Sequence, residues 1–417
     1  MGVNLIDSVV NGYSSREVKD FLKKPNNRGV TYCDILTISD SINKIIETAL
    51  KDLKNESKDL FKPLRKSDTF LFPDIHGRLD LFVQNMYMAG LIDKQGNWKG
   101  NKKTAVLLGD LISRGTYSVE TLIYARSLQE QSKLVGGNFE VLIGNHEHCV
   151  LNDACLDFYN MSNVKLVGEL LKENIEKGHT KIAYADNSKN MICVHAGIEK
   201  EILKWAIREI KPSLALKLFP DRKIASSEIF DLMEKNNITI EHIADWMNSV
   251  FGKDLSADAP LLRNYSVGAD VSGVINSRKK DMQKDVQNIL TDKTYKMNQF
   301  VGHTTTDNPF NLANAKSFGA VKKINRRFYL DYDLLRGKMA FVGIDGKNVY
   351  QMHSKANGLD QNCKPYKQIK KGIPEHLIDT AGCYHGNTKK LDFSNWSLKL
   401  IARLPETHKK LEKSLVM

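Results

Sequence analysis

The stretch TFLFPDIHG at residues 69–77 is a short apolar run that ends on an aspartate, a histidine and a glycine. Four other apolar runs lead into polar motifs in the same way: GDLISRG (109–115), GNHE (144–147), HAG (195–197) and GHT (302–304). Short β-branched or aliphatic runs bounded by glycine or proline are typical of buried strands. We therefore expect strands at residues 69–72, 105–108, 141–143, 191–194 and 300–301.

Each expected strand is followed by a residue that can ligate a metal or touch a phosphate. In an open α/β sheet the carboxyl ends of the strands face the ligand crevice, so these side chains should converge there. Oxygen and imidazole ligands without a thiolate suit Mn²⁺, Fe or Zn²⁺. The converging side chains are Asp74, His76, Asp110, Asn145, His146, His195 and His303.

Two divalent cations can clamp an in-line phosphoryl displacement, and such a pair needs a bridging carboxylate. Asp110, at the end of the second strand, is the expected bridge. Asp74 and His76 are two residues apart, so on an extended segment their side chains point the same way and are assigned to the first metal. The second metal is left with Asn145, His195 and His303.

The ordered motifs resemble those of the calcineurin-like metallophosphoesterases, specifically the phosphoprotein phosphatase type, whose signatures run GDxHG, GDxxDRG, GNH[ED], H[GA]G and GHT. The resemblance covers roughly residues 67–350 and implies an α/β fold with a central β-sandwich flanked by helices. It implies two divalent cations, Mn²⁺ or alternatively Fe or Zn²⁺, held by the residues assigned above. It also implies hydrolysis of phosphomonoesters by a hydroxide that bridges the two cations.

The same resemblance assigns the residues that act on the substrate. The histidine of GNHE, here His146, is the general acid that protonates the leaving group. Arg114 and Arg263 are the phosphate clamps, because a planar guanidinium donates two parallel hydrogen bonds to a phosphoryl group. The alignment at Arg263 rests on a few residues of PLLRNY, and Arg208 or Arg278 are alternatives there.

Two positions depart from the family pattern. Pro73 stands where the first motif usually has glycine, which changes only the entry to the loop. Ser113 stands where many phosphoprotein phosphatases carry an aspartate that orients and charges the catalytic histidine, and Glu147 and Asp331 are candidate substitutes. Symmetrical diadenosine tetraphosphatases of the same superfamily tolerate a small residue at this position, and HAG in place of HGG points the same way.

We consider three functions. The favoured one is a phosphatase that acts on phosphoproteins, because the helical additions beside the motifs resemble those of secreted effector phosphatases from intracellular bacterial pathogens. The alternative is a symmetrical diadenosine tetraphosphate hydrolase. A non-catalytic basic scaffold is disfavoured, since a candidate for every metal ligand is present.

Three regions are expected in the chain. Residues 1–66 form an N-terminal helical extension, in which Ser14 and Glu17 are a capping box ahead of a helix. Residues 67–354 form the catalytic domain, with a helical insertion at about 199–300 that is either a substrate-selecting cap or a structural buttress. Residues 355–417 form a basic C-terminal extension.

The C-terminal extension has 12 Lys or Arg and 6 Asp or Glu, so it carries +6 (12 minus 6) of the formal net charge of +12. A solvated surface is expected there, with weak association with anionic membranes as the alternative. No nucleic-acid partner is expected, because no RNA-binding aromatic motif occurs.

Neither a membrane span nor a secretory signal is expected. No apolar run approaches the roughly 18 residues of a transmembrane helix, and the start MGVNLI lacks a charged region followed by an apolar core. Six scattered cysteines without a CxxC pair fit a reducing compartment. We expect a cytoplasmic location, with secretion into a host cell without a classical signal as the alternative.

Overall fold

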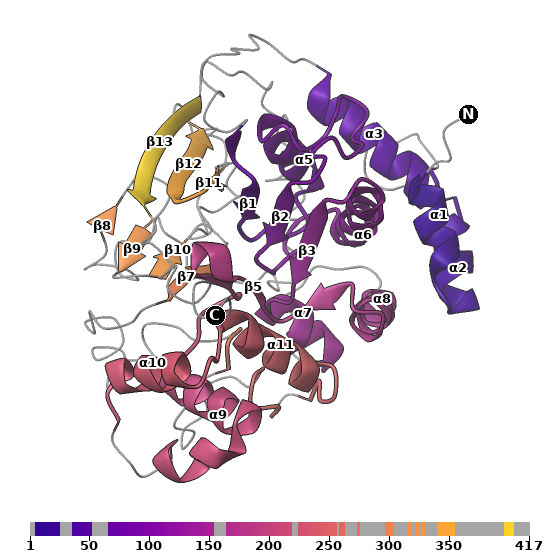
Figure 1. The fold of residues 1–417 in the computed structure, drawn as a ribbon. Helices are drawn as coiled ribbons and strands as arrows, with labels where there is room; N and C mark the ends of the chain where they lie inside the picture. Colours follow the sequence, from indigo (N-terminus) through magenta and orange to yellow (C-terminus); the bar gives the residue numbers. More distant parts are fainter. Residues whose placement is uncertain are drawn as a thin grey trace, which may run out of the picture.

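The computed structural model contains two β-sheets that stack on one another, with helices on both outer faces (Figure 1). It describes residues 5–25, 36–51, 66–153, 164–218, 224–256, 258–262, 273–275, 297–303, 316–317, 322–324, 327–329, 340–354 and 396–403.

The described strands are β1 (Thr69–Phe72), β2 (Thr104–Leu107), β3 (Asn138–Leu142), β4 (Thr180–Lys181), β5 (Tyr184–Asp186), β6 (Met191–Cys193), β7 (Asn298–Val301), β8 (Lys316–Ser317), β9 (Lys322–Ile324), β10 (Arg327–Tyr329), β11 (Ala340–Asp345), β12 (Asn348–Ser354) and β13 (Trp396–Arg403). The first sheet has the strand order β13-β12-β11-β1-β2-β3-β4, and the second has the order β5-β6-β7-β10-β9-β8. Buried side chains of both sheets, such as Leu71 and Val106 of the first and Phe300 of the second, form one apolar cluster between them. The expected α/β fold with a central β-sandwich is confirmed.

The five expected motif strands are present as β1, β2, β3, β6 and β7. We expected these strands to lie in one open sheet, and they do not. Strands β1, β2 and β3 are parallel neighbours in the first sheet, and β6 and β7 are parallel neighbours in the second. A strand buried in a sandwich is as apolar as one in an open sheet, so the sequence could not separate the two cases. The motifs still meet, because the strands of both sheets end at one rim.

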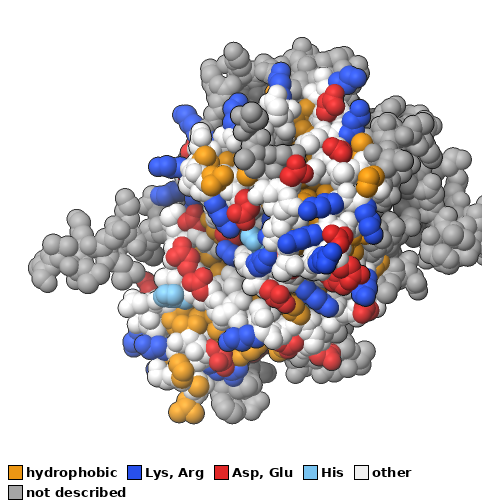
Figure 2. All heavy atoms as spheres, turned by 90° about the vertical axis from the view of Figure 1, so that its right-hand side faces the viewer, with side chains coloured by type: hydrophobic (Ala, Val, Ile, Leu, Met, Phe, Trp, Pro, Cys, Tyr) orange, Lys and Arg blue, Asp and Glu red, His pale blue; other side chains and the backbone are white. Residues whose placement is uncertain are grey.

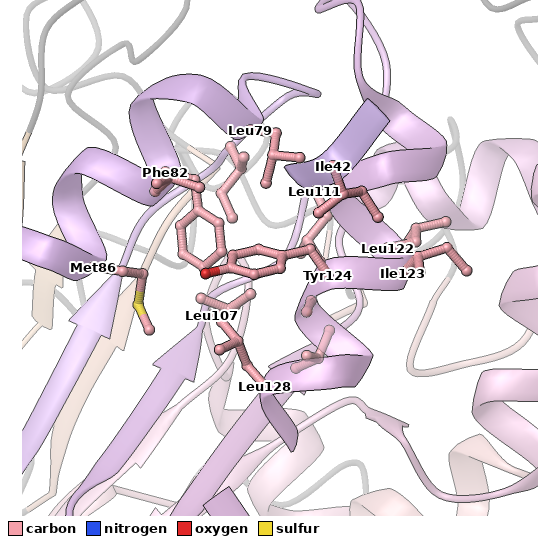
Figure 3. Close-up of a cluster of buried hydrophobic side chains, with 14 of the residues drawn as sticks. Ile42, Leu79, Phe82, Met86, Leu107, Leu111, Leu122, Ile123, Tyr124 and Leu128 are labelled. Atoms are coloured by element: carbon pink, nitrogen blue, oxygen red, sulfur yellow. The ribbon is translucent and has the colours of Figure 1, made fainter. Parts of the chain in front are cut away.

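Helices cover the outer face of each sheet, and they are α1 (Leu5–Gly12), α2 (Arg16–Lys23), α3 (Ile38–Leu50), α5 (Leu79–Met88), α6 (Ser118–Leu134), α7 (Asn145–Leu151), α8 (Val164–Glu176), η2 (Asn187–Lys189), α9 (Lys200–Ile210), η3 (Pro212–Leu218), α10 (Ser226–Lys235) and α11 (Ile240–Phe251). Figure 3 shows how α3, α5 and α6 pack over the first sheet: Tyr124 of α6 lies among Phe82, Leu107 and Ile42. The Tyr124 hydroxyl donates to the carbonyl of Gly96 at 2.7 Å, so its one polar atom is satisfied in the core.

The N-terminal helices form a further layer outside α5, α6 and α8 (Figure 1). Helix α3 packs on α5 and α6, which already cover the outer face of the first sheet. Ser41 of α3 donates to Glu120 of α6 at 3.2 Å. The predicted capping box of Ser14 and Glu17 was wrong: the N-cap of α2 is Ser15, whose hydroxyl accepts the amide of Val18, and the backbone amide of Ser14 donates to Glu173 of α8.

The described helices of the insertion cover the outer face of the second sheet. Each of these helices buries one apolar face: Leu203 and Ile207 of α9 and Ile243 and Met247 of α11 lie in one buried cluster. Helix α11 contacts α9, β5 and β6. These helices therefore support the second sheet, which is the geometry of a buttress.

The C-terminal part of the chain contributes a strand to the first sheet. β13 pairs antiparallel with β12, from Trp396 opposite Ser354 to Arg403 opposite Asn348. The lysine pairs at 370–371, 389–390 and 409–410 lie outside the described residues. Among the described residues, no helix has the length and apolarity needed to span a bilayer.

Charges of both signs are interspersed on the face that carries the N-terminal helices (Figure 2). Ion pairs such as Lys177 with Glu173 at 2.6 Å and Lys133 with Glu130 at 3.9 Å are formed within single helices of that region. Such a mixed surface is typical of a solvated face.

Candidate active site

Several motif residues at the rim have left-handed backbone. His76, Asp110, Ser113, Arg114 and His303 have φ between 49° and 70°. Each such conformation costs a non-glycine residue about 1–3 kcal/mol and persists only where the surroundings enforce it. Because these left-handed residues occur together in the motif loops, the loops must be held in this shape by their surroundings, as is common at functional sites.

Asp110 lies at the centre of the rim and belongs to two groups of potential metal ligands. Its Oδ2 lies 3.9 Å from Nε2 of His76 and 3.7 Å from Nε2 of His146. Its Oδ1 lies 3.5 Å from Nε2 of His195. One ligand atom each from Asp110, His76 and His146, and likewise from Asp110, His195 and His303, lie within 4.8 Å of one another.

The second group is ordered by bonds to the backbone and to an amide. Nδ1 of His195 donates to the carbonyl of Leu108 at 2.7 Å, which leaves Nε2 as the atom that faces Asp110. Oδ1 of Asn145 lies 3.1 Å from Nε2 of His195 and 2.9 Å from Nδ1 of His303. The three side chains expected at the second metal are therefore in mutual contact.

Asp74 joins the first motif to the last two. Both of its carboxylate oxygens accept the backbone amide of His303, at 3.1 and 3.2 Å. Its Oδ1 also lies 4.0 Å from Nδ1 of His195. Asp74 and Asp110 are both buried, and their carboxylates flank the imidazole of His195.

The residues of this rim fit divalent cations. A Cβ on Gly144 would collide with the carboxylate of Asp110, and a Cβ on Gly302 would collide with that of Asp74, so glycine leaves room around both acids. The donors are oxygens and imidazole nitrogens, which suit Mn²⁺, Fe or Zn²⁺. Burial, with Arg114 and His146 nearby, holds the pKa of His76 well below its usual range, and metal ligation requires that neutral imidazole.

The buried carboxylates create a strongly negative environment. Burial alone would lower the pKa of His195, but Asp110 and Asp74 raise that pKa to about 10. Burial opposes ionisation of Asp110, yet the imidazoles of His146, His195 and His76 keep its pKa well below the usual range. The negative charge of the carboxylates favours the binding of cations, and metal ions supply that positive charge at such sites.

His146 is held at both ring nitrogens. Nη2 of Arg114 donates to its Nε2 at 3.0 Å, and Nη1 donates to Nε2 of His76 at 3.1 Å. Because arginine has no acceptor, Nε2 of His146 is unprotonated here and Nδ1 donates to the hydroxyl of Ser113. Ser113 thus makes the contact with the imidazole that we associated with the aspartate of the family pattern.

Glu147 ties two motif loops together and does not contact His146 in any described bond. Its carboxylate accepts the backbone amides of Gly144 at 2.8 Å, Asp110 at 3.0 Å, Leu111 at 2.7 Å and Ile112 at 3.1 Å. Burial and the nearby Asp110 raise the pKa of Glu147 to about 7, against these amide bonds. The geometry therefore favours a structural role for Glu147 over that of a substitute for the missing aspartate.

The structure brings together all the expected metal ligands together with His146 and Arg114. The second expected clamp, Arg263, lies outside the described residues, as do Arg278 and Asp331. Arg208 lies on α9, on the outer side of the second sheet. The sequence did not predict the carbonyls that face two of the ligands, which are Leu108, 2.7 Å from Nδ1 of His195, and Ile112, 3.4 Å from Nδ1 of His76, because a carbonyl carries no signal in the sequence.

A family model and several curated relatives match the part of the chain that carries this site. The family model described as calcineurin-like phosphoesterase matches residues 69–273. Shewanella-like protein phosphatase 2 of Arabidopsis thaliana is 32% identical over 74 residues, which are 18% of this chain and 19% of that protein. A symmetrical bis(5'-nucleosyl)-tetraphosphatase of Hamiltonella defensa subsp. Acyrthosiphon pisum is 30% identical over 161 residues, or 37% of this chain and 55% of that enzyme.

The match spans about half or less of the length of these curated relatives. A solved structure of a cold-active protein-tyrosine phosphatase from a psychrophilic Shewanella species aligns with a TM-score of 0.42 at 16% identity, over 72% of this chain and 86% of that one. The family match begins at β1 and includes the first four motifs, whose side chains meet at one rim with those of the fifth. Residues 69–273 of the chain therefore form a domain of the calcineurin-like phosphoesterase family.

Proposed function

We propose that this protein is a phosphatase that uses two divalent cations, Mn²⁺ by preference, to hydrolyse phosphomonoesters on phosphoproteins. The observation that carries the proposal is the position of Asp110, whose carboxylate lies between the expected first-metal ligand His76 and the expected second-metal ligands His195 and His303. A shared carboxylate between two ligand groups is the arrangement that a two-metal phosphoryl-transfer site requires.

Asp74, His76 and Asp110 would hold the first cation, and Asn145, His195 and His303, with Asp110, would hold the second. When bound, the cations would supply Lewis acidity at phosphorus and lower the pKa of the attacking water. His76 would hold the cation through Nε2, whose lone pair here accepts from Arg114. The guanidinium of Arg114 would then be free for a phosphoryl group, to which it can donate two parallel hydrogen bonds.

His146 would supply the proton that the leaving oxygen needs from Nε2, once that nitrogen carries a proton in place of the bond from Arg114. Its Nε2 lies 3.7 Å from Asp110 and 3.0 Å from Arg114, so it stands where the clamp and the shared ligand meet. The ring cannot turn freely, because Ser113 binds Nδ1. Glu147 keeps the loops of the second and third motifs in register through the amides that it binds.

The phosphoprotein substrate is proposed because one of the relatives is a protein phosphatase by name. A second candidate, hydrolysis of diadenosine tetraphosphate, is favoured by Ser113, by HAG in place of HGG, and by relatives that are symmetrical tetraphosphatases. Cys149 and Cys193, the cysteines within the described residues, form no disulfide bond. Reduced thiols fit a reducing cytoplasm, either of the producing cell or of a host cell that receives the protein as an effector.

A side-by-side assay distinguishes the two substrates. Purified protein with Mn²⁺ is tested against phosphoserine, phosphothreonine and phosphotyrosine peptides and against diadenosine tetraphosphate. We expect kcat/KM to be higher for at least one class of phosphopeptide than for the dinucleotide. A higher value for the dinucleotide would replace the proposed substrate with the second candidate, and no hydrolysis of either would remove both.

Ser113 offers a test of how His146 is positioned. Ser113→Ala should lower kcat about tenfold for a poor leaving group, because losing one buried hydrogen bond costs about 1 kcal/mol. KM should change little. Ser113→Asp should restore the rate, since a carboxylate accepts the same Nδ1–H bond and stabilises the charged ring. Ser249→Ala, at an exposed serine of α11, is the matched control, and equal rates for all variants would contradict this role.

A further inference from the structure

We infer that the end of the insertion positions the second set of metal ligands, and that Gly273 and Val274 are positioning residues for His195. The inference rests on the proposed metal-dependent function and concerns residues outside the five motifs that carry the ligands. We call this element the brace, and it consists of residues 255–256, 261–262 and 273–275.

The brace is bonded to the loop that follows His195. The carbonyl of Val274 accepts the backbone amides of Ala196 at 2.8 Å and Gly197 at 3.1 Å. These two residues come directly after His195 in the HAG motif, and Val274 is fully buried. A shift of the Val274 carbonyl would therefore move the backbone that carries the ligand.

The two pieces of the brace lie against each other too closely for a side chain. The amide of Val274 donates to the carbonyl of Leu261 at 2.9 Å. A Cβ on Gly273 would stand 2.5 Å from the Leu261 oxygen and 2.8 Å from the Leu262 nitrogen. Both neighbours are backbone atoms that cannot rotate away, so any side chain at Gly273 must push Val274 and Leu261 apart.

The brace is also bonded to the helix that carries the third motif. Nε2 of His148 donates to the carbonyl of Ser256 at 3.1 Å, and Nδ2 of Asn152 donates to that of Leu255 at 3.0 Å. His148 lies on α7, whose first residue is Asn145, and Asn152 is the C-cap of that helix.

The brace thus joins α7 to the HAG loop, and these two elements meet in the 3.1 Å contact between Oδ1 of Asn145 and Nε2 of His195. Groups that orient metal ligands from outside the ligand set usually change metal affinity by about 10–100-fold when they are altered. The brace should therefore act on the second metal and leave the first, which depends on the loops after β1 and β2, unchanged.

The test is calorimetric titration of metal-stripped protein with Mn²⁺, together with thermal unfolding to confirm that each variant is folded. Wild-type protein should bind two ions in separable steps, and Asn145→Ala identifies the step that belongs to the second metal. Gly273→Ala should weaken that same step by about 10–100-fold and leave the other step within about twofold. Excess Mn²⁺ should restore most of the phosphatase activity.

Gly252→Ala is the matched control, because Gly252 has helical backbone and its added Cβ would meet only the Asn248 carbonyl at 3.8 Å. If Gly273→Ala does not fold, the double variant His148→Ala/Asn152→Ala tests the same inference by removing bonds without adding atoms. It should weaken the second step by about fivefold or more, as expected for the loss of one or two hydrogen bonds.

Unchanged binding in a folded variant, or equal weakening of both steps, would overturn the inference while the proposed function stands. If wild-type protein binds no Mn²⁺, the proposed function itself fails, and the inference fails with it.

Discussion

Asp110→Asn should abolish the metal-dependent hydrolysis of an aryl phosphate, with a loss of at least about 10³-fold in kcat/KM. The carboxylate is shared by both ligand groups, so a neutral amide weakens both cations at once. Cations supply several kcal/mol of charge stabilisation in such reactions, and each 1.36 kcal/mol is about tenfold in rate. Removing the metal from wild-type protein with a chelator should have the same effect, reversed by Mn²⁺.

The substitution tests the ligand and not the backbone, because asparagine accepts the left-handed conformation that Asp110 adopts at φ 52°. Asp153→Asn is the matched control: Asp153 is exposed and has nearly the same φ of 50°. Activity, metal content by elemental analysis and thermal unfolding are measured for both variants. Full activity of metal-stripped wild-type protein would refute the two-metal site.

His146→Asn should lower the rate on a phosphate ester with a poor leaving group by roughly 10²–10⁴-fold, the usual range for general acid catalysis. Two cations should remain bound, because His146 is not among the assigned ligands. The loss should be much smaller for an aryl phosphate with a good leaving group, which departs with little protonation.

This dependence on the leaving group separates proton transfer from metal binding. His146 lies 3.7 Å from Asp110, as close as His76 does, so geometry alone would allow it to act as a ligand. Equal losses for good and poor leaving groups, with reduced metal content, would assign His146 to the metal. His242→Asn, at an exposed histidine of α11, is the control for an unspecific histidine effect.

The placement of the motif residues at strand ends could be predicted from five apolar runs. A buried strand is visible in the sequence as a short apolar run, and its end is visible as the change to polar residues. A run such as residues 69–72 is too short and too apolar for a helix, and the polar residues after it must lie at the end of the strand. The identity of those residues, acids and imidazoles without thiolates, predicted the class of metal and hence the class of reaction. Asp74, Asp110 and His195 accordingly meet at one rim.

The arrangement of the elements around that rim could not be predicted in the same way. The sequence of an apolar strand does not indicate whether the next strand lies in the same sheet or in the facing one. Only the structure shows that β1–β3 belong to one sheet and β6–β7 to the other. The helical spacing of the apolar residues in 38–50 indicates that one face is buried, but it does not indicate which elements cover that face. Packing decided that α3 lies on α5 and α6 and not on the sheet.

The sequence by itself determined the strands, the order of the motifs and the chemistry of the ligands, because these depend on residue type and local periodicity. Only the tertiary structure decided which backbone groups hold the ligands in place. Glu147 binds amides of two loops, and Val274 offers a carbonyl to the loop after His195. These are contacts between a side chain or a carbonyl and distant backbone, and every residue carries the same backbone groups, so the sequence contains no mark of them.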